Sequence, residues 1–219
     1  MMDKEKQFKE YDKTYNKYVY SKINKNKKVL DLGCNTGLLG EALKKNKNCI
    51  VYGADYSKEA IILAKKRLDY SVVCNLEKEV PFESEKFDVI VLADILEHLK
   101  DPENLLNKIK NLLKKEGVII SCIPNVANIN IRFQLLFGKW DYKKSGILDK
   151  THLRFFTKKT MKLLFENKGY KIIKIDSTPG FEFFCLYHFK ILKRIKENLC
   201  NIYPSLFANQ FIILSKKNQ

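Results

Sequence analysis

The chain of 219 residues lacks the features that mark membrane, secreted and disulfide-stabilised proteins. No run of 18 apolar residues occurs, so we expect no membrane-spanning helix. The N-terminal stretch MMDKEKQFKEYDK is rich in charge, which argues against a secretory signal. The six cysteines are scattered, without a CxxC pair or another metal-ligand spacing. This distribution is typical of small core residues in a protein of a reducing compartment. We therefore expect a cytoplasmic protein.

Arginine is also scarce: 37 of the 41 basic residues are lysine. Residues 29–130 are nearly neutral, with 14 basic and 15 acidic residues, whereas residues 131–219 hold 18 basic and 6 acidic ones. This imbalance indicates an anionic partner, namely a phosphorylated or nucleotide-linked substrate, a nucleic acid or a membrane surface, or else a lysine-rich codon usage. The few arginines and the lack of an appended RNA-binding module weigh against nucleic acid.

Strand and helix patterns alternate along the chain, which predicts an α/β fold with an open sheet and helices on both faces. No repeat or low-complexity linker interrupts this alternation, so we expect one domain over residues 1–219. The predicted strands cover residues 28–32, 49–55, 70–76, 87–94, 117–124, 171–178 and 209–217. The predicted helices cover residues 4–24, 36–45, 58–68, 102–117 and 157–170, and part of 181–206.

A glycine turn follows the first predicted strand, in VLDLGCNTG. Gly33 and Gly37 let the backbone approach a ligand closely, and Asp31 can accept a hydrogen bond from an ammonium group. Asp55 ends the second strand and can hold both hydroxyls of a ribose. In a parallel sheet, these groups meet at the carboxyl edge of the strands. The combination suits a nicotinamide dinucleotide and S-adenosylmethionine (AdoMet) equally.

The remainder of the pattern distinguishes the two cofactors. A pyrophosphate loop reads GxGxxG, but Asn35 occupies the place of the second glycine, and Asn tolerates left-handed backbone angles. After the third strand, Asn75 and Leu76 are placed to bracket an adenine. VLDLGCNTG, GADYS, CNLEKEVPFESEKFDVIVLADILEHLKDPENLL and LKKEGVIISCIPN, in this order, resemble a class I AdoMet-dependent methyltransferase over residues 28–178.

This resemblance implies a Rossmann-like fold with a mostly parallel seven-stranded sheet and a reversed final hairpin. It also implies S-adenosyl-L-methionine as cofactor. Residues 1–27 would form an N-terminal helical cap, and residues 125–157 an insertion on the acceptor side. The expected cofactor-binding residues are Asp31, Gly33 and Gly37 for the methionine part, Asp55 for the ribose, Asn75 and Leu76 for the adenine, and in addition Tyr56 and Ala93.

Histidines are the best candidates for catalysis, because a hydroxyl acceptor benefits from a general base. His152 lies in the insertion and is the predicted base, whereas His98, just past the fourth strand, is the second candidate. His188 lies in an aromatic stretch, where we expect a structural role. Arg154 is placed either to grip an anionic acceptor or to pair with a carboxylate such as Asp149.

The insertion is similar to methyltransferases found with bacterial surface-polysaccharide glycosyltransferases. That resemblance implies O-methylation of a sugar, a nucleotide-sugar or a glycan end. The acceptor would then be a small molecule or a glycan, and an anionic acceptor would suit the basic C-terminal third. One fold hosts many acceptors, so two alternatives stay open. In the first, the chain is an inactive methyltransferase-like scaffold that docks a partner or a membrane surface through residues 181–195.

The second alternative is a metal-dependent enzyme that methylates the 2′-hydroxyl at the 3′ end of RNA. The pattern D-x-x-E-H followed by a later histidine resembles the metal site of small-RNA methyltransferases of that kind. The four candidate ligands are Asp94, Glu97, His98 and His152. Aspartate replaces the first glutamate of that family and has a shorter arm, so we expect no metal site and no metal dependence.

Overall fold

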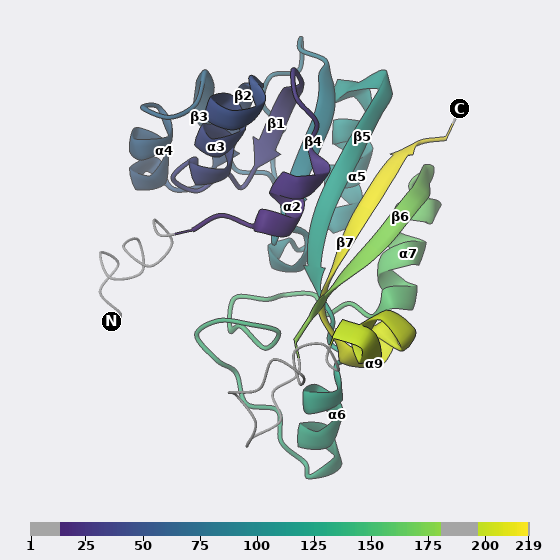
Figure 1. Cartoon of the computed structure of the whole chain (residues 1–219). Coiled ribbons are helices and arrows are strands. Elements are labelled where there is room, and N and C mark those ends of the chain that lie inside the picture. Colours follow the sequence, from purple (N-terminus) through teal and green to yellow (C-terminus); the bar gives the residue numbers. More distant parts are fainter. Residues whose placement is uncertain (1–13, 181–196, 219) are drawn as a thin grey trace.

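The computed structural model describes residues 14–180 and 197–218, and these form a single sheet flanked by helices (Figure 1). The strands are β1 (Lys28–Leu32), β2 (Ile50–Asp55), β3 (Tyr70–Val73), β4 (Phe87–Ala93), β5 (Leu113–Pro124), β6 (Tyr170–Pro179) and β7 (Ala208–Lys217). The helices are α2 (Lys17–Lys22), α3 (Leu38–Lys47), α4 (Lys58–Ala64), α5 (Pro102–Ile109), α6 (Ile129–Leu136), α7 (Lys158–Asn167) and α9 (Pro204–Phe207). Short 3₁₀ turns are η1 (Leu96–His98) and η2 (Lys110–Leu112).

The seven strands lie in the order β3-β2-β1-β4-β5-β7-β6. Strands β1 to β5 pair in parallel, and β7 runs antiparallel to both of its neighbours, β5 and β6. The strand order reverses between β1 and β4, and ligands of open α/β sheets bind beyond the carboxyl ends of the strands at such a point. This topology confirms the predicted Rossmann-like sheet with a reversed final hairpin.

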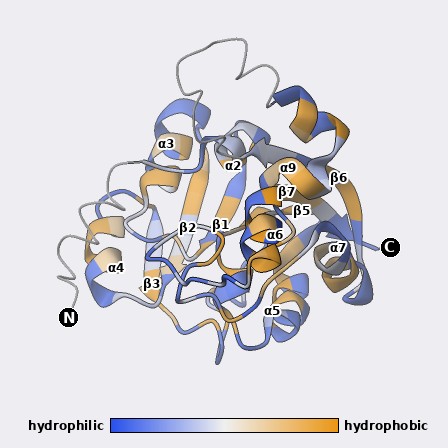
Figure 2. Cartoon of the chain, turned by 90° about the horizontal axis from the view of Figure 1, so that it is seen from below, coloured by the Kyte–Doolittle hydropathy of each residue, from blue (hydrophilic) through white to orange (hydrophobic). Residues whose placement is uncertain are grey.

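Alternating side chains of the central strands supply two hydrophobic cores, one on each face. Leu30 and Ile90 point into the core that α5 and α7 cover, whereas Val29 and Val89 point into the core that α2, α3 and α4 cover. Both sets are buried, which is why these strands read as continuous apolar runs. In Figure 2 the central strands are largely orange, while α3 and α4 each carry a blue side and an orange side.

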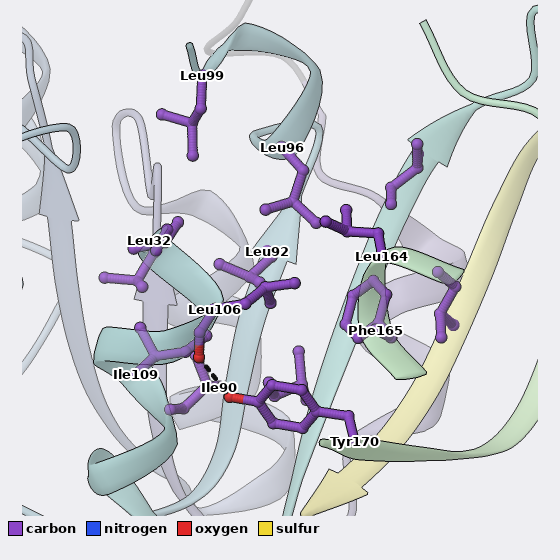
Figure 3. Packing of buried hydrophobic residues seen from close by; sticks show 14 of the residues in the cluster. Leu32, Ile90, Leu92, Leu96, Leu99, Leu106, Ile109, Leu164, Phe165 and Tyr170 are labelled. Carbon is purple, nitrogen blue, oxygen red and sulfur yellow. Dashed lines mark hydrogen bonds between the residues drawn. The ribbon is translucent and has the colours of Figure 1, made fainter. Parts of the chain in front are cut away.

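The α5 and α7 side of the sheet holds the larger aromatic residues (Figure 3). Phe165 of α7 packs near Tyr170 at the start of β6, with ring centroids 6.1 Å apart. The Tyr170 hydroxyl is buried and donates a 2.6 Å hydrogen bond to the backbone carbonyl of Leu106 in α5. This bond joins β6, at the edge of the sheet, to α5, the helix that follows β4. It therefore links the reversed hairpin to the parallel part of the fold.

Several predicted element boundaries are wrong. The predicted helix 102–117 ends at Ile109, because Leu113 is needed as a buried strand residue opposite Phe87. Gly117 therefore does not close a helix. It lies inside β5, where an added Cβ would stand 2.9 Å from the Phe87 carbonyl oxygen. The third strand ends at Val73 rather than residue 76.

The helices near the N-terminus are also shorter than predicted. Of the predicted helix 4–24, residues 1–13 lie outside the described part, and α2 itself begins only at Lys17. Asn16 starts it by accepting hydrogen bonds from two backbone N–H groups through its side chain, which is the role of an N-cap residue. The predicted helix 58–68 ends at Ala64 and continues as a turn. Across the described residues, no helix combines the length and hydropathy that a membrane span requires.

Candidate active site

The loop between β1 and α3 takes its shape from three residues with positive φ. Gly33 and Gly37 have φ of 78° and 84°, and Asn35 has φ of 48°, so the left-handed conformation expected of Asn35 is observed. The backbone N–H groups of Gly33 and Cys34 both donate to the Ala54 carbonyl, at 2.7 Å and 3.0 Å. The loop is thereby tied to the end of β2, and its backbone lies at the carboxyl edge of the sheet.

Asp55 is held in a fixed orientation at the end of β2. One carboxylate oxygen accepts the Asn35 N–H and the other accepts the Ser57 N–H, each at 2.9 Å. Each oxygen keeps a further lone pair, because a carboxylate oxygen can accept two hydrogen bonds. The glycine loop thus orients the acidic group that the sequence assigns to ribose hydroxyls.

Asp31 is a buried carboxylate at the end of β1, 3% exposed. Loss of hydration raises its pKa from 3.8 to about 7, and the nearby charge of Asp55 adds to this rise. Ionising such a group inside the protein is costly unless a positive charge lies close to it. A ligand with a cationic amino group supplies the charge that would favour the ionised form.

A cavity of about 540 Å³ opens at this edge of the sheet. Its volume lies in the usual range of sites for small molecules and cofactors. Of the predicted cofactor and catalytic residues, it is lined by Asp31, Gly33, Asp55, Ala93, His98 and His152. The strand ends, the glycine loop and the insertion therefore contribute to one cavity.

Four predicted cofactor residues do not line this cavity. Gly37 shapes the loop, and Tyr56 lies beside Asp55 with 75% of its surface exposed. The Asn75 side chain accepts the backbone N–H of Glu77, and Leu76 packs against the core. The N–H of Cys74, the preceding residue, donates to the Asp55 carbonyl at 2.9 Å, which places the 75–76 turn beside the end of β2. The role of Asn75 and Leu76 in binding adenine stays a prediction.

His98 and His152 lie together although 53 residues separate them along the chain. Their ring centroids are 4.8 Å apart. The backbone carbonyl of Glu97 accepts hydrogen bonds from the N–H groups of Leu153 and Arg154, at 2.8 Å and 3.0 Å. These two bonds attach the insertion to the turn after β4 and bring the predicted base next to the second candidate.

Two acidic side chains share the cavity wall with the histidines: Glu97 is buried and Asp94 is half-buried. Burial raises the pKa of Asp94 to about 6, and Asp94 accepts a 2.6 Å hydrogen bond from the Gln210 side chain of β7. Burial, with the charge of Asp94 as second cause, raises the pKa of Glu97 well above its usual value. The pKa of His98 is lowered, first by burial and then by the charge of His152. The site therefore combines acidic groups that resist ionisation with an imidazole that resists protonation.

Comparison with known proteins places this geometry in a family. A family model described as a methyltransferase domain matches residues 4–175. The chain belongs to the methyltransferase domain family. The ubiquinone biosynthesis O-methyltransferase of Glaesserella parasuis serovar 5 (strain SH0165) is 32% identical over 123 residues, which cover 50% of this chain and 52% of that protein. The same enzyme of Coxiella burnetii (strain Dugway 5J108-111) is 36% identical over 107 residues, 46% of this chain and 45% of that protein. The chain spans about half the length of these curated relatives.

Solved structures agree with the methyltransferase fold. A SAM-dependent methyltransferase from Archaeoglobus fulgidus aligns with a TM-score of 0.65 at 18% identity and covers 98% of this chain and 100% of that one. A complex between the Haloferax volcanii Trm112 methyltransferase activator and a methyltransferase gives the same TM-score at 16% identity, over 93% and 88% of the two chains. The [4+2]-cyclase SpnF aligns with a TM-score of 0.62 at 12% identity, over 92% and 80% of the two chains. Because a cyclase shares this fold, the fold alone does not define the reaction.

The methyltransferase domain family implies AdoMet as the cofactor, and the residues present fit it. Asp31, buried in the cavity wall with a raised pKa, is suited to the positively charged amino group. Gly33 lines the cavity, and an added Cβ there would stand 1.9 Å from the Ile95 side chain, so a larger residue would disturb this part of the wall. Asp55, with a free lone pair on each oxygen, is suited to the ribose hydroxyls. Bound AdoMet supplies a methyl group on a sulfonium, which makes that carbon reactive toward a nucleophile.

Within the described part of the chain, Arg154 is bound to a backbone carbonyl and not to Asp149, and its role toward an anionic acceptor stays a prediction. Its guanidinium donates to the Lys100 backbone carbonyl, at 3.1 Å from Nε and 2.5 Å from the terminal nitrogen. Asp149 instead accepts the backbone N–H and the hydroxyl of Thr151, at 2.8 Å and 2.6 Å. Arg154 thus holds the insertion on the loop after β4 and does not line the cavity. His188 and the proposed docking segment 181–195 lie outside the described residues.

Residues distant in the sequence complete the cavity, and sequence reasoning missed them. Gln210 of β7 reaches Asp94, 116 residues away, because β7 inserts beside β5. Asn209, next to it, lines the same cavity. From the N-terminal segment, Asn16 lines the cavity and donates to the Cys122 sulfur at 3.4 Å. A cap signal at Asn16 is visible in the sequence, but no local pattern indicates that its side chain meets β5.

Proposed function

We propose that the chain transfers a methyl group from AdoMet to a hydroxyl oxygen of a sugar, nucleotide-sugar or glycan acceptor. The observation that carries this proposal is the polar character of the cavity wall that the insertion and β7 contribute. Ser145, Asp149, His152, Asn209 and Gln210 line it. A saccharide presents several hydroxyls that such groups can bind, whereas an apolar ring would leave the polar groups unpaired. The curated relatives are named O-methyltransferases, which supports an oxygen acceptor.

In this proposal the chain orients the acceptor and removes the proton from its hydroxyl, since the methyl transfer itself is a direct displacement. The new bond joins the acceptor oxygen to the methyl carbon while the bond from that carbon to sulfur breaks and sulfur keeps the electron pair. The acceptor proton leaves on the side of His98 and His152. These imidazoles are carried by the turn after β4 and by the insertion, so they reach the cavity from different elements than Asp31 and Asp55 do.

A kinetic comparison of His152→Ala and His98→Ala tests this assignment. We expect His152→Ala to lower kcat by about 10²-fold or more, with AdoMet affinity within a few-fold of the wild type, because the residue acts on the acceptor. His98→Ala should have the smaller effect. The assay measures methylated product by mass spectrometry over a panel of saccharides, nucleotide-sugars, a catechol and an RNA 3′ end. Near-normal turnover by the His152 variant would contradict the role of this residue.

The acceptor class has its own refuting outcome in the same panel. Methylation of the catechol alone would transfer the proposal to quinone-type acceptors like those in the relatives' names. Methylation of RNA alone would favour the terminal 2′-hydroxyl alternative, which the proximity of Glu97, His98 and His152 keeps as the second candidate. Absence of AdoMet binding by calorimetry would leave only the scaffold alternative.

A further inference from the structure

Glu97 is a buried carboxylate whose two oxygens find no hydrogen-bond partner among the described residues. It is 1% exposed, and both its Oε atoms are inaccessible to solvent and unpaired. Burying a carboxylate in this way costs free energy, because its hydration is lost and nothing in the surrounding protein replaces it. An unpaired buried carboxyl group in a cavity wall calls for a partner from outside the chain, such as a bound ion or water.

Two imidazoles stand beside this carboxylate. Glu97, His98 and His152 each offer one ligand atom, and these three atoms all lie within 4.8 Å of one another. A metal ion binds its nitrogen and oxygen ligands at about 2.0–2.2 Å, so two ligand atoms of one ion lie at most about 4.4 Å apart, and small side-chain rotations bring these three atoms within that distance. No hydrogen bond joins the carboxylate to either ring within the described part of the chain, so the three groups do not satisfy one another.

The ring orientations match those of metal-binding histidines. His152 Nδ1 lies 3.0 Å from the Ile147 carbonyl oxygen, and His98 Nδ1 lies 3.2 Å from the Thr151 carbonyl oxygen. A carbonyl only accepts, so Nδ1 of each ring carries the proton, and Nε2 keeps its lone pair. Histidine ligands of metals usually donate their second N–H to a carbonyl or carboxylate in this way. The Thr151 hydroxyl also touches His98 Nδ1, at 3.2 Å, and is itself bound to Asp149.

We propose that Glu97, His98 and His152 bind one divalent transition-metal ion at the acceptor side of the cavity. Two imidazoles and one carboxylate suit Mn²⁺, Fe²⁺, Co²⁺ or Zn²⁺ better than Mg²⁺ or Ca²⁺, which prefer oxygen ligands. Asp94 is not part of this group, because its carboxylate is turned to Gln210. The expectation of no metal site rested on the short arm of Asp94, and three ligands assemble without that residue.

The role of the ion rests on the proposed function. Three protein ligands leave coordination positions open, and one of these can take the acceptor hydroxyl. A bound cation lowers the pKa of that hydroxyl, so that its proton leaves to solvent near neutral pH and the methyl group takes its place on oxygen. In the metal-bound protein, His152 is then a metal ligand. The ion, rather than His152 as a general base, promotes the loss of the proton from the acceptor hydroxyl.

The test is metal binding by the full chain, freed of metal with EDTA and dialysed. Mn²⁺ is titrated and its free fraction is read by electron paramagnetic resonance, and Co²⁺ is titrated against its visible spectrum. We expect one Mn²⁺ per chain and a Co²⁺ spectrum without the intense bands of thiolate ligation, which excludes binding to the cysteines. Glu97→Gln and His152→Ala should each weaken Mn²⁺ binding at least about 10-fold, since even residues that only orient ligands cost ~10–100-fold.

Glu116→Gln is the matched control, because Glu116 is an exposed glutamate near the amino end of β5, at the opposite edge of the sheet. It should bind Mn²⁺ like the wild type, and AdoMet affinity should be retained in every variant as the sign of a folded protein. Equal Mn²⁺ binding by wild type and Glu97→Gln would overturn the proposal, as would the absence of Mn²⁺ binding by a wild type that still binds AdoMet. Mn²⁺ binding without methyl transfer would support the ion site and count against the proposed function instead.

Discussion

The raised pKa of Asp31 predicts that AdoMet binding releases a proton. The shift from 3.8 to about 7 arises from burial and from the charge of Asp55. At 1.36 kcal/mol per pKa unit, it corresponds to about 4 kcal/mol of disfavour for the ionised form in the free protein. The cationic amino group of AdoMet favours that ionised form. Below pH 7, binding therefore has to displace the proton from Asp31.

The magnitude follows from the pKa. With a pKa of about 7, Asp31 is about 90% protonated at pH 6 and about 10% protonated at pH 8, so binding releases about 0.9 and about 0.1 protons at these two pH values. AdoMet affinity should rise by up to about 10-fold per pH unit below 7. Above a pH of about 8 it should fall again, because the amino group of the ligand loses its charge near that pH.

Calorimetry in two buffers of different ionisation enthalpy counts these protons directly. Asp31→Asn is the matched variant: it keeps the size of the side chain, should bind AdoMet more weakly at pH 8, and should release no proton at pH 6. A wild type that releases no proton at pH 6, or a variant that releases as many as the wild type, would refute the assignment of Asp31 to the amino group.

The same pKa predicts how stability depends on pH. The folded-state pKa of Asp31 is raised, so its contribution to the free energy of unfolding is fully present below pH 3.8 and is lost as the pH rises to about 7. The pKa values of Asp94 and Glu97 are also raised, so the wild type alone does not isolate the effect of Asp31, and it has to be compared with Asp31→Asn. Between pH 4 and pH 7, urea denaturation should show a smaller loss of stability for Asp31→Asn than for the wild type.

Three further predictions concern the cofactor loop and the core. Asp55→Ala should weaken AdoMet binding by about 30- to 150-fold, or ~2–3 kcal/mol, because it removes charge-assisted hydrogen bonds to ribose, and unchanged affinity in calorimetry would contradict this. Gly33→Ala should lower AdoMet affinity and thermal stability, since φ is 78° and the new Cβ meets Ile95; a variant with normal melting temperature and affinity would show that the loop tolerates a side chain. Tyr170→Phe should lower the free energy of unfolding by ~1–2 kcal/mol, because the buried carbonyl of Leu106 loses its donor, and urea midpoints measure this against the wild type.

Local sequence determines much of the cofactor half of this protein. Strands that are apolar on both faces, such as β1 and β4, can only be buried between two helical layers, so their pattern predicts a covered parallel sheet. Gly33 and Gly37 mark the turn because left-handed backbone angles suit glycine, and Asn35 adopts such an angle as expected. The acidic strand ends Asp31 and Asp55 meet because parallel strands end at the same edge. The reversed final hairpin came from the family resemblance, since periodicity does not give strand order.

The acceptor half is decided by tertiary structure. His98 and His152 become neighbours through two backbone hydrogen bonds to Glu97, and no hydrophobic pattern encodes which carbonyl a distant loop will meet. Gln210 reaches Asp94 only because β7 pairs antiparallel beside β5, a choice made by the packing of the whole sheet. The signals that set the length and the end of a helix are local in the sequence. Contacts between side chains more than 50 residues apart depend instead on how the helices and strands pack together. The hydrophobic pattern therefore does not place the two histidines together. A family resemblance groups them with Glu97 and Asp94 as candidate ligands, and the fold shows that Glu97, His98 and His152 come together without Asp94.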